Sequence, residues 1–359
     1  MMTRLRRCGA LGLASALACG ALACGAADRV HEGEHVTLII DPAVETCGDM
    51  LGHMDRFVAT LADYLRVPLA GERFTFVWYS EERFAAEAPC GDNWWGECER
   101  GGEILSTVAP LDSMLAYMLL ARVGSPPPFF AEGALVAFTP DLDSFLGGLP
   151  GDGDVQDLLA YGKGGATLAG AFTRFLIDRH GRDAYLAFYA GVRARASLPE
   201  IEAAHAEHFG ESLTETSVAF DAGRRRCPER KFELKLLECS APRIAWDGDS
   251  LLLRRSLACG EDDVVGYPSS SPFNDYALSL STLEVTTAGP FEIRFTADEP
   301  ASLVFAGCGG CEDETAILLS AGREPVRQWL PVGRYYLKLV GNVKAAPSVA
   351  LRIERVDVP

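Results

Sequence analysis

The stretch GEILSTVAPLDSMLAYMLLARVGSPPPFFAEGALVAF, residues 102–138, decides how this chain folds. Its residue types predict a strand over 103–107, a helix over 110–123, a Pro-rich turn and a second helix over 129–138. The first helix carries one apolar stripe, because its large apolar residues recur at helical spacing. That stripe consists of Leu111, Met114, Leu115, Met118, Leu119 and Val123. One face of this helix is therefore expected to be buried.

The second helix contains Phe130-Ala131-Glu132-Gly133, shortly after the Pro-rich turn. This arrangement resembles the active-site core of gluzincin-type zinc metallopeptidases, the peptidase MA-like families. In those families the first helix carries HExxH, with two zinc-binding His and a Glu that activates water, and the second helix supplies a Glu ligand. The resemblance implies that Glu132 matches that third ligand. In place of HExxH this chain has Leu111-Asp112-Ser113-Met114-Leu115.

The two His positions of the motif are therefore Leu111 and Leu115, and the catalytic Glu is replaced by Asp112. Leucine has no lone pair for a metal, and a single carboxylate cannot hold zinc, because catalytic sites use about three protein ligands. We therefore expect no catalytic residue, no metal ligand and no cofactor. Asp112 and Glu132, together with the two leucines, are interpreted as vestigial positions.

The elements around this core predict an α+β fold. A strand at 35–40, an amphipathic helix at 49–65, a strand at 73–79 and a short helix at 81–88 precede it, and helices follow as far as residue 224. The resemblance covers about residues 34–224 and implies a gluzincin-like domain, a small sheet plus a helical bundle, over 34–226. Residues 227–359 are rich in short β segments, including one predicted at 232–238, and predict an all-β sandwich. Within them Leu330-Pro331-Val332-Gly333-Arg334-Tyr335-Tyr336-Leu337 resembles bacterial pre-peptidase C-terminal domains.

Several polar residues have both a structural and a functional interpretation. His205 and His208 stand one helical turn apart and can bind a metal, but acidic neighbours favour a solvated polar face. His180 precedes Gly181, where capping of a helix C-terminus explains it better than metal binding. Asp152, Asp154 and Asp157 lack EF-hand spacing, and helix capping explains them better than calcium. His53, in the first amphipathic helix, is interpreted as structural.

The N-terminus has the features of an export signal. Three Arg precede an apolar stretch, residues 11–23, which is too short to span a bilayer as a mature helix. Small residues before Cys24 resemble a bacterial lipobox, which implies lipidation of Cys24. Cys19 follows a similar pattern, and secretion without lipidation remains the alternative. We therefore predict a signal peptide and lipobox over residues 1–24 and a tether over 25–33. The protein is expected to be exported, either anchored by lipid in a bacterial cell envelope or secreted.

Cysteine usage agrees with export. Outside the leader the chain has an even number of cysteines, which suggests disulfides. The candidates are Cys47, Cys90, Cys98, Cys227, Cys239, Cys259, Cys308 and Cys311. Proximity and symmetry suggest Cys90 with Cys98, Cys239 with Cys259 and Cys47 with Cys227. The CxxC at 308–311 is interpreted as structural rather than as redox-active or zinc-binding, because no strand-then-helix context or second Cys or His pair accompanies it.

The net charge of the chain limits the classes of molecule that it can bind. A formal net charge of −17 repels nucleic acid and anionic membrane surfaces. Contact with a membrane is therefore expected only through a lipid anchor. The preferred hypothesis is a pseudo-metallopeptidase that binds a protein, a peptide or a glycan. The alternative is a hydrolase with a relocated site, in which Asp112 and Glu132 form a carboxylate pair. A structural role in the envelope without a specific ligand is a third possibility.

Overall fold

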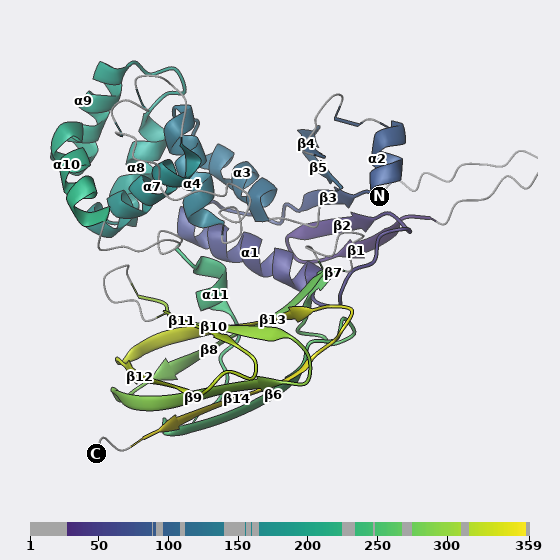
Figure 1. Ribbon diagram of the computed structural model, residues 1–359. Helices are drawn as coiled ribbons and strands as arrows, with labels where there is room; N and C mark the ends of the chain where they lie inside the picture. The colour runs from purple at the N-terminus through teal and green to yellow at the C-terminus, as the bar shows by residue number, and fades with distance from the viewer. Residues whose placement is uncertain are drawn as a thin grey trace, which may run out of the picture.

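The computed structural model contains two layered parts that lie against each other (Figure 1). The structure describes residues 27–87, 89–90, 96–107, 112–139, 155, 159, 165–224, 234–246, 248–267, 275–309 and 316–356. One part joins a small sheet to a group of helices, and the other is a β-sandwich (Figure 1). The α+β class predicted above is therefore confirmed.

The small sheet is mixed and has the strand order β1-β2-β3-β5-β4. Its strands are β1 (Arg29–Glu32), β2 (Val36–Ile40), β3 (Phe74–Trp78), β4 (Glu97–Arg100) and β5 (Glu103–Ser106). β2, β3 and β5 are parallel, while β1 and β4 run antiparallel at the two edges. Alternating residues of β2 and β3 pack on α1 (Met50–Leu65), whose predicted apolar face is buried. The short helix α2 (Glu81–Glu87) follows β3.

The helical layer begins with the two central helices. These are α3 (Asp112–Val123) and α4 (Pro128–Phe138). Then come α7 (Ala166–His180), α8 (Arg182–Gly191), α9 (Leu198–Phe209) and α10 (Leu213–Arg224). In α3, Leu115 and Leu119 are fully buried, as the apolar stripe predicts. Pro128 suits the first turn of α4, because its missing N–H has no helical partner there.

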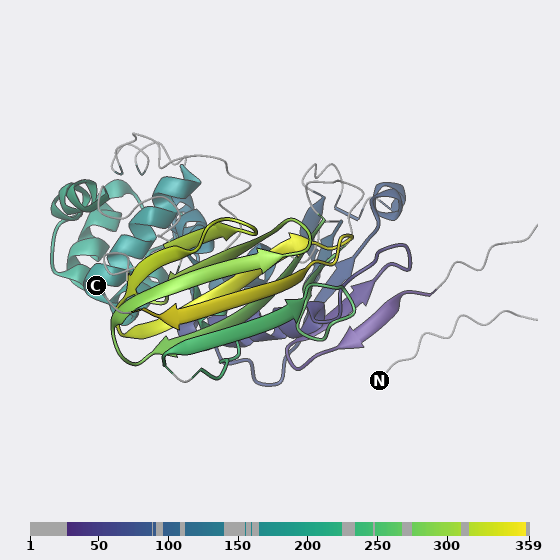
Figure 2. The same ribbon diagram turned by 60° about the horizontal axis from the view of Figure 1, so that its bottom comes forward.

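The sandwich consists of two antiparallel sheets, ordered β11-β10-β13-β8-β7 and β12-β9-β14-β6. Its strands are β6 (Ser250–Ser256), β7 (Val265–Tyr267), β8 (Tyr276–Val285), β9 (Gly289–Ala297), β10 (Ala301–Gly307), β11 (Ala316–Ser320), β12 (Val326–Leu330), β13 (Gly333–Asn342) and β14 (Ser348–Arg355). Apolar residues alternate along each strand and meet between the sheets, as sandwich packing requires. Figure 2 shows the strands of the sandwich in front, with the teal helices beyond one of their ends.

Three disulfides are formed within the described residues: Cys47–Cys259, Cys90–Cys98 and Cys239–Cys308. The pairing predicted for Cys90 is confirmed. The predicted Cys239–Cys259 and Cys47–Cys227 pairings are wrong, because tertiary contact brings Cys47 to Cys259 and Cys239 to Cys308. The CxxC cysteine Cys308 thus belongs to a long-range structural disulfide, and its predicted structural role is confirmed. Cys227 and Cys311 lie outside the described residues.

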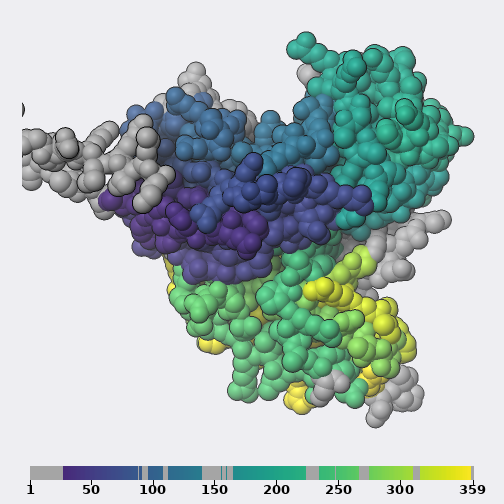
Figure 3. Space-filling view, turned by 180° about the vertical axis from the view of Figure 1, so that it is seen from behind, coloured from purple at the N-terminus to yellow at the C-terminus, as the bar shows by residue number. Residues whose placement is uncertain are grey.

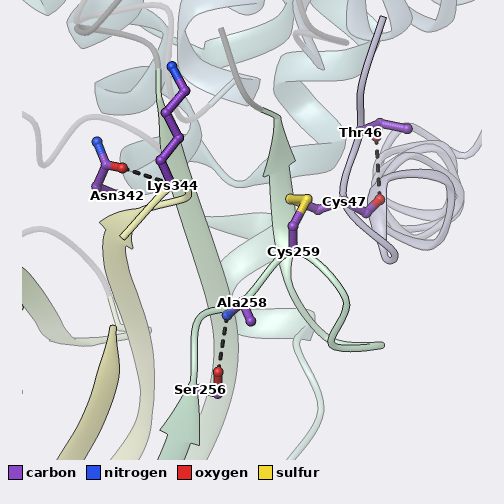
Figure 4. The surroundings of a disulfide bond; sticks show 7 residues. All are labelled: Thr46, Cys47, Ser256, Ala258, Cys259, Asn342 and Lys344. Atoms are coloured by element: carbon purple, nitrogen blue, oxygen red, sulfur yellow. Dashed lines mark hydrogen bonds between the residues drawn. A yellow bond between two sulfur atoms is a disulfide. The ribbon is translucent and has the colours of Figure 1, made fainter. Parts of the chain in front are cut away.

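The two parts meet along α1 and share a hydrophobic core. Val265 and Leu278 of the sandwich belong to the same buried cluster as α1. Next to the disulfide shown in Figure 4, the Cys47 N–H donates to the Gly266 carbonyl at 3.0 Å and the Gly48 N–H donates to the Cys259 carbonyl at 3.0 Å. Viewed from behind, the purple-to-teal part rests on the green-to-yellow sandwich (Figure 3). The connection between the parts is therefore covalent as well as packed.

Two predictions of local structure are corrected. Residues 29–32, assigned to the tether, form β1, which pairs antiparallel with β2. Residues 236–238, assigned to a strand, lie in helix α11 (Leu236–Ser240), where Leu237 is buried in the core shared with α1. In α11 tertiary contacts outweigh the local signal, whereas β1 is held by pairing with the neighbouring strand β2. No helix of the described residues is long and apolar enough to cross a membrane.

Candidate functional site

The residues aligned with the metallopeptidase motif lie at the start of α3. Leu115 has no exposed surface and belongs to the core cluster that also contains α1 and α4. A packed aliphatic side chain therefore fills this place in the core, which the resemblance described above would assign to the second zinc-binding His. Leu111, at the position of the first, lies outside the described residues.

Asp112, the first residue of α3, forms a buried pair with His53 of α1. His53 Nε2 and Asp112 Oδ2 are 3.1 Å apart, and the two residues are 8% and 9% exposed. The position also suits a carboxylate, since the helix N-terminus carries partial positive charge. Asp112 Oδ1 has no hydrogen-bond partner among the described residues. The pair therefore joins α1 to α3 inside the protein, with little of either residue open to a substrate.

Sequence reasoning explained His53 and Asp112 separately and missed their contact. They are 59 residues apart. Neither helix contains a local pattern that points to the other residue. Only the packing of α1 against α3, which follows from their apolar faces, brings the two side chains together.

Glu132 lies on α4 and its side chain is exposed. Partial burial of the carboxylate nevertheless raises the pKa of Glu132. The structure pairs Asp112 with His53 rather than with Glu132. The contact recorded for the Asp112 carboxylate is thus with an imidazole of α1.

Gly133, the last residue of the motif, has a clear packing role. A Cβ at this position would lie 2.5 Å from the Ala169 carbonyl oxygen and 2.7 Å from Thr173 Oγ1. Helices α4 and α7 can approach this closely only because Gly133 has no side chain. Packing thus explains the Gly of the motif without any chemistry at Glu132.

A second polar cluster joins α7, α9 and α10 around Glu211. Arg179 donates from Nε and Nη2 to the two Glu211 carboxylate oxygens, at 2.8 Å each, and these hydrogen bonds lower the pKa of Glu211 to about 2. His180 Nε2 lies 2.9 Å from Glu211 Oε1. The Thr216 hydroxyl also donates to Glu211, at 2.9 Å. Glu211, in the turn between α9 and α10, therefore fixes that turn to α7 and to α10.

His205 is fully buried beside this cluster, so the solvated face predicted for it is wrong. Its Nδ1 is 3.0 Å from the Glu211 carbonyl oxygen, and its ring packs on Phe188 and Phe209. Burial lowers the pKa of His205. The position of His180 in the last turn of α7 agrees with its predicted capping role.

No group of three or more His, Cys, Asp or Glu suited to a metal ion is found in the part of the chain that the structure describes. The lipidation candidates Cys24 and Cys19 and the aspartates Asp152, Asp154 and Asp157 lie outside it. Seen from behind, the upper surface is hollowed between the blue residues and the teal helices (Figure 3).

No protein-family model and no curated protein matches the chain. Among solved structures, the chain is similar to the pre-peptidase C-terminal domain of collagenase from Bacillus anthracis, with 15% identity and a TM-score of 0.22, over 32% of this chain and 95% of that domain. It is also similar to CapF solved with the inhibitor 3-isopropenyl-tropolone, with 16% identity and a TM-score of 0.14, over 30% of this chain and 32% of that one.

Proposed function

We propose that this chain is an exported, non-catalytic binding protein with a metallopeptidase-like domain over 34–226 and a β-sandwich domain over 227–359. The observation that carries the proposal is the complete burial of Leu115 at the position where the related peptidases have a zinc-binding His. The order of sheet, α3, Pro-rich turn and α4 supports the resemblance to gluzincins. The partner is a protein, a peptide or a glycan.

Export is supported by the three disulfides, which persist in oxidising compartments. Anchoring would occur through lipidation of Cys24, with Cys19 as the alternative residue. A Cys24→Ser variant should move from the membrane fraction to the soluble fraction, while Cys19→Ser should stay in the membrane. The opposite result would assign the anchor to Cys19.

The first experiment is metal analysis of the purified mature protein after zinc loading and dialysis. We expect far less than one zinc per chain. The aliphatic side chain of Leu115 offers no ligand where the similar peptidases have a His, and Glu132 alone cannot retain the ion. About one zinc per chain would overturn the proposal, since the fold would then have recruited other ligands.

A matched variant tests the underlying resemblance. In Leu111→His/Leu115→His, two imidazoles join Glu132 as a His₂Glu set, and we expect this variant to retain about one zinc per chain. The same variant with Glu132→Gln should lose most of that zinc. If the double variant folds, as judged by circular dichroism, and both proteins retain equal zinc, the gluzincin-like assignment is wrong.

The second candidate is a hydrolase with a relocated site. It is favoured by one observation, the His53–Asp112 contact of 3.1 Å, because a carboxylate beside an imidazole is a common general-base arrangement. The raised pKa of Glu132 would also suit a proton donor. Burial of the pair argues against this candidate, since a substrate would have to displace core residues to reach it.

Hydrolysis assays with peptide, ester and glycoside substrates separate the two functions. The hydrolase candidate requires that Glu132→Gln and His53→Asn each abolish some turnover. Equal rates in the wild-type protein and in both variants would remove it.

A further inference from the structure

Strand β12 is an open edge of the sandwich. It lies at the end of the sheet β12-β9-β14-β6 and pairs only with β9 among the described strands. Figure 1 shows it at the rim, at the same end of the sandwich as β11. An edge strand offers unpaired backbone groups to any extended chain that can match them.

The neighbouring hydrogen bonds show which backbone groups of β12 point outward. On β9, the carbonyl of Pro290 accepts from the Val356 N–H on the β14 side, while that of Phe295 accepts from the Gly322 N–H on the β12 side. Odd-numbered residues of β9 therefore face β12, and these pair with Val326, Gln328 and Leu330. The backbone groups of the residues between them, 327 and 329, thus point away from the sheet. In agreement, the Trp329 carbonyl accepts from the Gln328 side-chain amide at 3.3 Å rather than from β9.

Prolines bound this edge on both sides. Pro325 and Pro331 are odd-numbered, like Arg327 and Trp329, so an extended backbone would turn their nitrogen atoms outward as well. Proline has no N–H to donate there. The edge therefore offers N–H donors at residues 327 and 329 only. A partner strand that extends past either proline gains no further donor.

The side chains between the prolines are unusual for a free edge. Trp329 is 56% exposed, and the side chain of Arg327 is 69% exposed on the same outer face. Arg327 Nε lies 3.4 Å from Glu292 of β9. An exposed Trp beside an Arg is typical of the centre of protein interfaces.

We propose that β12 binds β12 of a second copy of this chain, antiparallel and centred on Gln328. In this register Arg327 of each copy lies opposite Trp329 of the other, and Pro325 lies opposite Pro331. Each outward N–H then meets an outward carbonyl, which makes four backbone hydrogen bonds. Each Arg327 guanidinium also meets a Trp329 ring on the outer face, where cation–π attraction favours the pair.

The self-matching pattern points to a second copy rather than to a foreign peptide. A two-fold interface uses the same residues on both sides, so every interacting pair must lie symmetrically about one central residue. Here Arg327 and Trp329, which carry the donors, and Pro325 and Pro331 are all placed symmetrically about Gln328. The two four-stranded sheets would join into one. Because each side contributes only five strand residues, the dimer is expected to be weak and reversible.

Sedimentation equilibrium of the full mature protein, from about 1 µM to 1 mM, measures this association. We expect a reversible monomer–dimer equilibrium for the wild-type protein. Trp329→Pro removes an outward N–H and the ring but leaves the ladder to β9 intact, so it should abolish the dimer without unfolding the sandwich. The control is Leu252→Ser, since Leu252 is 61% exposed on β6 at the opposite edge of the same sheet and should be neutral.

A residue exchange tests the register. Trp329→Arg places Arg opposite Arg and removes two cation–π pairs, so the dissociation constant should rise about tenfold. The double variant Arg327→Trp/Trp329→Arg restores the opposite pairing and should return it to near the wild-type value.

Three results would overturn the proposal. They are a wild-type protein that stays monomeric to about 1 mM, a dimer that survives Trp329→Pro, and a residue exchange that restores nothing. Binding of an unrelated extended peptide to β12 with no self-association would assign the edge to a different partner.

Discussion

Asp112 and His53 show how a single contact changes the meaning of two residues. Asp112 is the first residue of α3, and its carboxylate is directed to an imidazole of α1, inside the protein. The contribution of such a buried polar pair to the free energy of unfolding is seen when one member is removed, because the other member then loses its buried contact. Its value to the protein is therefore measurable without any assay of function.

We predict strong coupling between these two residues. Asp112→Ala or His53→Ala should each lower the free energy of unfolding by about 3 kcal/mol, because each removes one side of a buried polar contact. The double variant should cost clearly less than the sum of the two. Urea unfolding of all four proteins gives the coupling energy.

The control for that cycle is the exposed Arg66–Asp183 pair, with side chains 59% and 63% exposed. Its coupling should stay below about 1 kcal/mol, because water screens it. Equal coupling in the two pairs would mean that His53 and Asp112 do not interact as the structure shows.

The lowered pKa of Glu211 predicts that the free energy of unfolding falls in a specific acid range. Its pKa is about 2 in the folded protein, below the ordinary value of 4.5, so the folded state binds this proton less readily than the unfolded state. The stabilisation is fully present above pH 4.5 and is lost as the pH falls from 4.5 to about 2. Glu211→Gln should therefore lower stability at neutral pH by about 2 kcal/mol and flatten the decline in that window. Urea unfolding at a series of pH values measures both effects.

Glu215→Gln serves as the comparison for Glu211, because Glu215 also has a lowered pKa but is exposed, and among the described residues its carboxylate accepts from Ser212. Its effect should be much smaller. If both variants leave the acid limb of the stability curve unchanged, the Arg179–Glu211 contact is not a source of stability.

At the scale of helices, the pair α4 and α7 depends on one missing side chain. Gly133 brings the backbone of α4 close to the Ala169 carbonyl, and Phe129 and Phe172 meet at 6.0 Å between ring centroids in the same interface. The sequence AEG attracted a functional interpretation through Glu132. The structure adds a packing reason for Gly133 that holds whatever Glu132 does.

Two Gly→Ala substitutions should therefore have opposite effects. Gly133→Ala should destabilise by about 2–3 kcal/mol, because backbone atoms of α7 cannot move aside. Gly223→Ala, in α10, should be neutral or stabilise by up to about 1 kcal/mol, since its new methyl group would make an ordinary contact at 3.7 Å with Phe175. Thermal unfolding distinguishes them, and a neutral Gly133→Ala would contradict the close approach of α4 and α7.

At the scale of the whole molecule, one disulfide links the two parts and another fixes α11 to the sandwich. Cys47–Cys259 joins residues 212 apart, and Cys239–Cys308 joins α11 to the end of β10 across 69 residues. Backbone hydrogen bonds surround the first of them. The sandwich is thus fixed to α1, the helix that carries His53.

The length of the closed loop predicts which disulfide matters more. Replacing Cys47 and Cys259 by Ser should cost about 4–5 kcal/mol, against about 2–3 kcal/mol for Cys90 and Cys98, whose separation is 8. The difference arises because a longer loop restricts the unfolded chain more. Denaturant unfolding of the two double variants measures it, and an equal loss in both would contradict this account.

Much of the fold was predictable from local pattern. The apolar faces of α1 and α3, the Pro-bounded start of α4 and most strands of the sandwich follow from residue spacing, because a helix or strand must bury its apolar side. The short Cys90–Cys98 disulfide was predictable for a similar reason, since neighbours in sequence meet easily. Helix α11 was not, because the α1 residues that it packs on lie far along the chain. Strand β1 was not, because its four exposed residues have no alternating apolar pattern, and it is held by backbone pairing with β2.

By itself, the sequence determined the α+β class, and it placed Leu111 and Leu115, whose side chains cannot bind a metal, in the central helical segment. Tertiary structure alone decided that Asp112 meets His53, that His205 is buried beside Glu211 and that Cys47 bonds to Cys259. The physical reason is the distance along the chain over which each interaction acts. Periodicity and side-chain chemistry act over a few residues, whereas buried polar pairs and disulfides depend on which distant segments the hydrophobic core brings into contact.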